Sequence, residues 1–94
     1  MEVQRFEWDE AKAQRNFVNH GISFPEAQTV FNDPLFLIFH DPDHSIQEQR
    51  FLILGESSRG NLLVVSYTER AEVIRLISAR IASRRERRDY ENEL

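Results

Sequence analysis

The chain has 94 residues, 40% of them hydrophobic and 30% charged, which is enough apolar material for one small core. This composition excludes a disordered chain, and the absence of cysteine excludes disulfides and thiolate metal sites. No apolar run is long enough to span a membrane. We therefore predict a single domain over residues 1–94, located in a reducing cytoplasm and without a membrane partner.

The charges are divided unevenly along the chain. The net charge of −4 taken alone disfavours nucleic acid as a ligand. However, residues 1–48 carry three basic and nine acidic side chains, whereas residues 49–94 carry nine basic and seven acidic ones. The basic residues of the second half are all arginines, which suit bidentate contact with phosphate. The pattern predicts an anion-binding side and a side for a cationic partner.

The N-terminal segment predicts a short strand followed by a helix. Alternation over residues 3–8 is typical of an edge strand. Asp9 is a suitable N-cap for a helix over residues 10–19, and Gly21 follows its end. The residues of this helix that we expect to face the core are Ala11, Phe17 and Val18.

A second helix has a stronger start signal. Ser23 and Glu26 match a capping box, with a proline in the first turn. Residues 32–34 contain Asn-Asp-Pro and should end the helix. The apolar stripe of this helix consists of Phe24, Ala27, Val30 and Phe31.

Four further strands and a last helix complete the predicted order β-α-α-β-β-β-β-α. The predicted strands cover residues 35–40, 50–56, 62–67 and 73–81. Ser83 and Glu86 form a capping box for a C-terminal helix that has little to bury beyond Tyr90 and Leu94. We expect an α+β fold in which two or three helices cover one face of a mainly antiparallel sheet.

Arg75 and Arg80 lie within the most apolar part of the sequence, the predicted strand 73–81. If Glu69 faces Glu72 across the turn and the strand is regular, the two arginines point to opposite faces of the sheet, unless a bulge or the strand end turns one of them. One interpretation is that each arginine reaches solvent or pairs with a nearby carboxylate such as Glu69 or Glu72. The other interpretation is a cationic patch for an anionic ligand such as a phosphate.

The candidate groups for other chemistry are few. Asp41, Asp43 and His44 are possible ligands for a divalent cation, but such side chains beside a proline more often form hydrogen-bonded turns. His20 follows the predicted first helix, where it could complement the helix dipole or transfer a proton. No phosphate-binding loop is present, and no Ser-His-Asp arrangement is evident. We therefore predict no metal and no cofactor.

The residue types present permit cleavage of RNA without a metal. This reaction needs a group that withdraws the 2′-OH proton, cations that stabilise the charged phosphorane, and an acid that protonates the leaving 5′-oxygen. Arginine suits the second task, and histidine or glutamate suits the first or third. The sequence allows this chemistry but does not by itself select it.

The chain resembles the BrnT family of type II toxins along nearly its whole length, most specifically over residues 67–91. The matching segments are 6–9 with Lys12, 20–21 followed by Phe24, Glu26 and Ala27, then 33–34, 41–45, 50–51, 67–70, 74–75, 77–80, 86–87 and 90–91. The resemblance implies a RelE-like fold and a ribonuclease that arrests translation. It also implies neutralisation by a BrnA antitoxin with a ribbon-helix-helix DNA-binding domain, in a complex that represses its own operon.

One position departs from the family pattern. Members commonly have lysine before the His-Gly pair, where this chain has Asn19. Either activity is weaker without that lysine, or Lys12, Arg15 or His20 substitutes for it. We expect phosphate or transition-state contacts from Arg50, Arg75 and Arg80, and proton transfer from His20, His44 or Glu48. We expect RNA contacts from Lys12, Arg59, Arg70 and Arg84, and antitoxin contacts from Arg87, Arg88 and Tyr90.

Two other functions remain open at this point. The chain could be a binding module without catalysis, acting as the corepressor partner of a DNA-binding antitoxin, because spare arginines and a polar terminal helix suit that role as well. A phosphate-dependent metabolic enzyme is the third reading, and the lack of a cofactor motif disfavours it.

Overall fold

The computed structural model describes residues 3–41 and 49–93, and within them five strands form one sheet with the order β1-β5-β4-β3-β2. β1 runs parallel to β5, and the other neighbouring pairs are antiparallel. The predicted α+β class and element order are confirmed. The strands are β1 (Arg5–Glu7), β2 (Leu37–His40), β3 (Phe51–Glu56), β4 (Leu62–Arg70) and β5 (Val73–Ile81). The helices are α1 (Glu10–His20), α2 (Phe24–Thr29) with the 3-10 turn η1 (Val30–Asn32), and α3 (Arg84–Asn92).

α1 begins and ends where the sequence predicts. The Asp9 carboxylate accepts the backbone N–H of Lys12 at 3.0 Å, and Gly21 ends the helix with a φ of 72°. The predicted core face is wrong, however, because Phe17 and Val18 are 56% and 83% exposed. Ala11 is exposed as well.

Asn16 is the α1 residue buried against the sheet. Its amide donates to the carbonyls of Ala79 at 2.9 Å and Ile22 at 3.0 Å, and its oxygen accepts the Ala79 N–H at 3.0 Å. β1 pairs with residues 73–75 of β5 only. Further along that edge of β5, the Asn16 side chain takes the place of a neighbouring strand and bonds the backbone N–H and C=O of Ala79. An apolar-stripe argument could not find this contact, because the residue that faces the sheet is polar.

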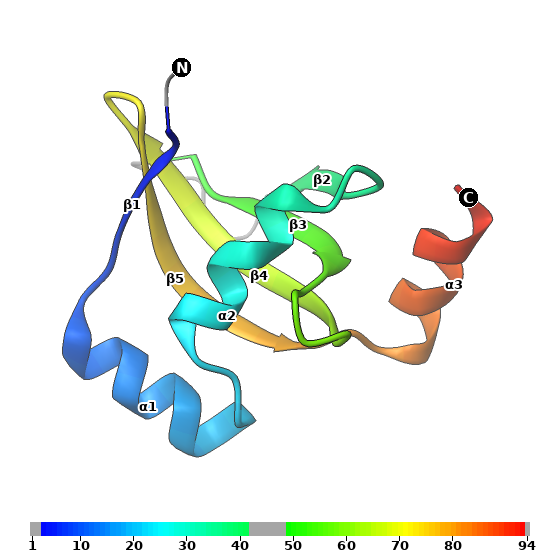
Figure 1. The fold of residues 1–94 in the computed structure, drawn as a ribbon, viewed down its shortest axis with the longest axis horizontal. Helices are drawn as coiled ribbons and strands as arrows, with labels where there is room; N and C mark the ends of the chain where they lie inside the picture. The colour runs from blue at the N-terminus through cyan, green and yellow to red at the C-terminus, as the bar shows by residue number, and fades with distance from the viewer. Residues whose placement is uncertain (1–2, 42–48, 94) are drawn as a thin grey trace.

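α2 and η1 pack across one face of the sheet (Figure 1). Phe24, Ala27 and Val30 are buried there, as their predicted stripe requires. Ser23 Oγ accepts the Glu26 N–H at 3.2 Å, but the Glu26 carboxylate does not complete a capping box. It is buried and instead accepts from the side chains of Ser57 and Asn61, both at 2.7 Å, and so fixes the β3–β4 turn.

α3 lies on the face of the sheet opposite α2. Tyr90 packs with Leu54, Leu62 and Val64, whereas the residues next to these on β3 and β4 belong to the α2 core. The Tyr90 hydroxyl donates to Asp33 at 2.6 Å, and burial together with this carboxylate raises the pKa of Tyr90 to about 12. The capping box of Ser83 and Glu86 is present as predicted. No helix in residues 3–41 and 49–93 is long and apolar enough to cross a membrane.

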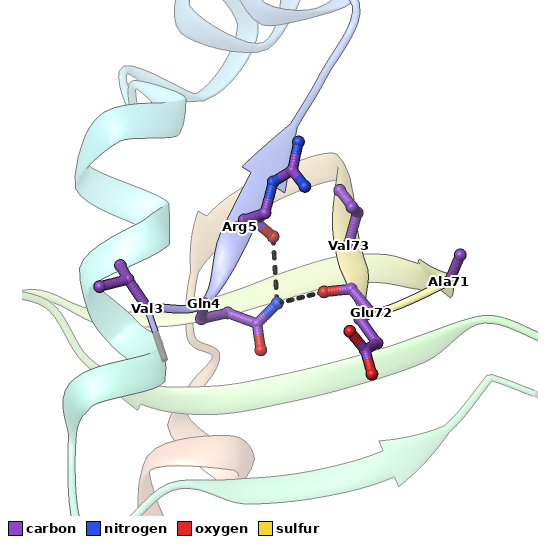
Figure 2. A pocket seen from close by; sticks show the side chains of 6 residues that line it. All are labelled: Val3, Gln4, Arg5, Ala71, Glu72 and Val73. Carbon is purple, nitrogen blue, oxygen red and sulfur yellow. Dashed lines mark hydrogen bonds between the residues drawn. The ribbon is translucent and has the colours of Figure 1, made fainter. Parts of the chain in front are cut away.

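The turn between β4 and β5 has the predicted length but lies one residue further along the chain than predicted. Arg70 pairs with Val73, so the loop has two residues, Ala71 and Glu72, with φ values of 47° and 72°. A two-residue loop of this kind normally contains Asn-Gly, because both positions need the left-handed region. Figure 2 shows the Gln4 amide between the backbone oxygens of Arg5 and Glu72, where it ties the β1 end of the sheet to this strained turn.

Candidate active site

A β-bulge in β5 brings Arg75 and Arg80 to the same face of the sheet. Ser66 pairs with Ser78, but its neighbour Tyr67 pairs with Leu76, so Ile77 is the extra residue. Leu76 and Ala79, which adjoin the two arginines in sequence, both lie in the α2 core. Both arginines therefore point to the opposite face, which we call the open face.

The predicted placement of the two arginines on opposite faces is therefore wrong. That prediction required a regular strand, and the bulge breaks the alternation between them. The predicted register was also shifted, since Arg75 pairs with Thr68 and not with Ser66. Near the turn, the predicted pairing of β4 with β5 is off by two residues, which leaves each side chain on its predicted face. Beyond the bulge the pairing is off by three residues, and an odd shift moves a side chain to the other face of the sheet.

Each arginine is held by a carboxylate of the chain. Arg75 forms an ion pair with Glu7, its partner on β1, and Arg80 forms a bidentate pair with Glu86 of α3 at 2.8 and 2.9 Å. The hydrogen bonds that Arg80 donates to Glu86 raise the pKa of Arg80, and the same contact lowers the pKa of Glu86 to about 2. The interpretation of a paired arginine is confirmed, although the partners are not the expected Glu69 and Glu72.

Three hydroxyl side chains lie on the same face of the sheet as the two arginines. Ser66 and Ser78 are cross-strand partners, and Thr68 is the partner of Arg75. Thr68 is fully buried, and its Oγ1 has no hydrogen-bond partner among residues 3–41 and 49–93. An unsatisfied buried hydroxyl costs stability and calls for an explanation, which places it among the functional candidates. The sequence does not reveal this row, because it depends on the observed pairing of β4 with β5 and on the bulge.

A shallow basic pocket adjoins the open face at the free edge of β5. It has a volume of about 210 Å³ and is lined by Lys12, Arg15, Asn16, Asn19, His20, Ile77 and Ser78. The bulge residue Ile77 and the open-face residue Ser78 form its wall on the sheet side. The structure thus brings the predicted Lys12 and His20 together with Asn19, the position that departs from the family pattern.

The comparison with family models decides which family this architecture represents. The model described as the ribonuclease toxin BrnT of type II toxin-antitoxin systems matches residues 8–86, which is most of the chain. This chain belongs to the BrnT family. Membership confirms the resemblance seen in the sequence, identifies the chain as a ribonuclease toxin of this class, and implies an antitoxin partner.

A solved BrnT structure has the same fold. The ribonuclease toxin BrnT of Brucella abortus superposes with a TM-score of 0.66 and 22% sequence identity, covering 87% of this chain and 100% of that chain. No curated protein matches. The BrnT family match extends to Glu86, so it includes both open-face arginines and the carboxylate that holds Arg80.

Other predicted residues of this BrnT-family chain lie at the ends of β3 and β4. Arg50 immediately precedes β3, whose first residue, Phe51, pairs with Tyr67. Arg59 lies in the turn that leads into β4, and Arg70 ends that strand beside the hairpin turn. His44 and Glu48 lie outside the described residues. Asp43, another of the possible cation ligands, lies outside them too.

The predicted partner-binding residues of α3 differ in exposure. Arg84, Arg87 and Arg88 are exposed around the first two turns of the helix. Tyr90 is buried and bonded to Asp33, so its role is to seat the helix against the sheet. A partner surface on α3 would consequently consist of its arginines.

Proposed function

We propose that this chain is a metal-independent endoribonuclease that cleaves RNA on the open face. The observation that carries the proposal is the bulge at Ile77, because it aligns two arginines with a row of hydroxyls on one surface. Bulges commonly re-aim side chains next to active sites. The family match to ribonuclease toxins supports the choice of RNA as substrate.

In the proposed mechanism the 2′-hydroxyl attacks the neighbouring phosphorus, the 5′-oxygen leaves, and a 2′,3′-cyclic phosphate forms. Arg75 and Arg80 stabilise the charge that develops on the phosphorane, as preorganised cations do in other phosphoryl reactions. Arg50, which immediately precedes β3, is proposed to assist them. Proton transfer is assigned to one of His20, His44 and Glu48.

Binding of the flanking nucleotides is proposed for basic residues around that face. Lys12 in the edge pocket takes the place of the lysine that the family pattern has at Asn19. The further RNA contacts are assigned to Arg59, Arg70 and Arg84. Cleavage of cellular RNA by this surface would arrest translation in the cytoplasm.

We further propose that a BrnA-like antitoxin with a ribbon-helix-helix domain neutralises the toxin and contacts Arg87 and Arg88. The chain itself would then reach operator DNA only through the antitoxin. The unequal division of charge, with basic residues concentrated in the second half, supports an acidic partner surface opposite α3.

The proposal is tested with the purified chain and a defined single-stranded RNA in the presence of EDTA. We expect cleavage that persists in EDTA and leaves cyclic phosphate ends. Retained cleavage with 3′-hydroxyl ends would exclude attack by the 2′-hydroxyl. Complete loss in EDTA, restored by a divalent cation, would exclude a metal-independent reaction.

A non-catalytic binding module is the second candidate, and one observation favours it. Both open-face arginines are already paired with carboxylates, as they would be in a purely structural role. In that case the folded chain would bind its antitoxin with normal affinity, leave RNA intact, and cause no growth arrest when expressed alone.

A further inference from the structure

Glu86 joins two parts of the molecule through one carboxylate. Its Oε1 accepts from Arg80 Nη1 at 2.8 Å and from the backbone N–H of Ser83 at 2.8 Å, while Oε2 accepts from Arg80 Nη2 at 2.9 Å. In return, Ser83 Oγ accepts the Glu86 N–H at 3.1 Å. The group that caps the start of α3 is therefore also the group that holds the last arginine of β5.

This contact fixes the direction of the Arg80 guanidinium. Of its five N–H donors, two go to Glu86 and a third points to the Ile81 carbonyl at 3.4 Å. The side chain is nevertheless 43% exposed, so the remaining N–H groups of Arg80 can reach a ligand on the open face. An exposed arginine without such a partner would sample many rotamers.

We propose that Glu86 is a positioning residue for Arg80 in RNA cleavage, an inference that rests on the function proposed above. The carboxylate acts in two opposite ways. It aligns a cation with the reacting phosphate, which raises the rate of the chemical step. It also places a negative charge near a polyanion, which weakens RNA binding. Loss of this charge should therefore lower kcat while KM stays the same or falls.

The test compares Glu86→Gln with Ser83→Ala. Glutamine can still cap the helix, because capping boxes accept Glu or Gln at this position, but it cannot form a charged fork with Arg80. Ser83→Ala weakens the same cap without touching the arginine. With kcat referred to the folded fraction, we expect a 10- to 100-fold loss for Glu86→Gln and less than a twofold change for Ser83→Ala.

A double-mutant cycle with Arg80→Lys asks whether Glu86 acts through the arginine. Lysine keeps the positive charge but cannot make the planar fork, so Glu86→Gln should then cost less than threefold in kcat. An equal loss in both backgrounds would overturn the positioning role. A Glu86→Gln enzyme as active as Ser83→Ala would overturn it too. If the folded wild type cleaves no RNA at all, the proposed function fails and this role fails with it.

Discussion

Replacing Asn16 with Ala should destabilise the chain more than any surface substitution in α1. The side chain is 6% exposed and makes three hydrogen bonds to backbone groups of Ala79 and Ile22. Its removal leaves a buried N–H unsatisfied, which costs about 1–3 kcal/mol, and loses further net hydrogen bonding of about 1 kcal/mol. We expect the free energy of unfolding to fall by about 2–4 kcal/mol, which corresponds to a drop of roughly 10–25 °C in Tm.

Asn16→Asp tests the same geometry through its pH dependence. One carboxylate oxygen can still accept the Ala79 N–H, but the other then faces two carbonyls. This arrangement favours the protonated acid, so the pKa of the introduced carboxyl is raised in the folded state. A raised pKa means that stability is retained below the unfolded value and lost as the pH rises through the folded value. We therefore expect the variant to be relatively more stable at pH 4 than at pH 7.

Urea unfolding followed by circular dichroism measures both variants. Asn19→Ala is the matched control, because Asn19 is exposed on the same helix, and it should change stability by less than about 0.5 kcal/mol. An Asn16→Ala chain as stable as this control would refute the role of Asn16 as the backbone partner of β5. An Asn16→Asp chain whose relative stability is flat between pH 4 and 7 would do the same.

Four further predictions concern the turn, the buried hydroxyl and the terminal helix. Changing Ala71 to Asn and Glu72 to Gly should stabilise the chain by about 1–2 kcal/mol, since both residues have positive φ, and a lower urea midpoint would contradict this. Thr68→Val should raise stability by about 1 kcal/mol, because the hydroxyl is buried without a partner in the described part of the chain, while cleavage falls if that hydroxyl serves the reaction. The pKa of Glu86, lowered to about 2, predicts stability that is present above pH 4.5 and is lost as the pH falls toward 2. This loss should be about 1–2 kcal/mol after screening and should be absent in Glu86→Gln. A triple change to Gln in α3, at Arg84, Arg87 and Arg88, should leave stability equal or slightly higher and weaken binding to RNA or antitoxin. Unfolding of the domain with intact affinities of the folded fraction would show that these arginines are structural.

Local signals predicted the helices well. Asp9, Ser23 and Ser83 cap the helices that the sequence assigned to them, and Gly21 adopts the left-handed conformation expected after α1. These features depend on residues within a few positions of one another, so the sequence alone carries them. The strands were also located, with their ends within three residues of the observed ones.

Long-range contacts were not predictable in the same way. The bulge at Ile77 has no local signature, since the residues on either side of it continue an apolar strand pattern. Asn16 contacts Ala79 across 63 positions, and Arg75 bonds Glu7 across 68. Only the fold brings these pairs together, and without it the faces of Arg75 and Arg80 could not be assigned.

The kinetics of Arg75→Ala, Arg80→Ala and the double variant test the central claim most directly. If both arginines contact one phosphate group on one surface, each single change should reduce kcat for RNA cleavage by about 10²–10³-fold, with the folded fraction unchanged. The double change should cost clearly less than the product of the two, because residues that act as a unit are not additive. Full cleavage by either single variant, or independent effects that multiply, would contradict the claim that the bulge aligns both arginines on one reacting group.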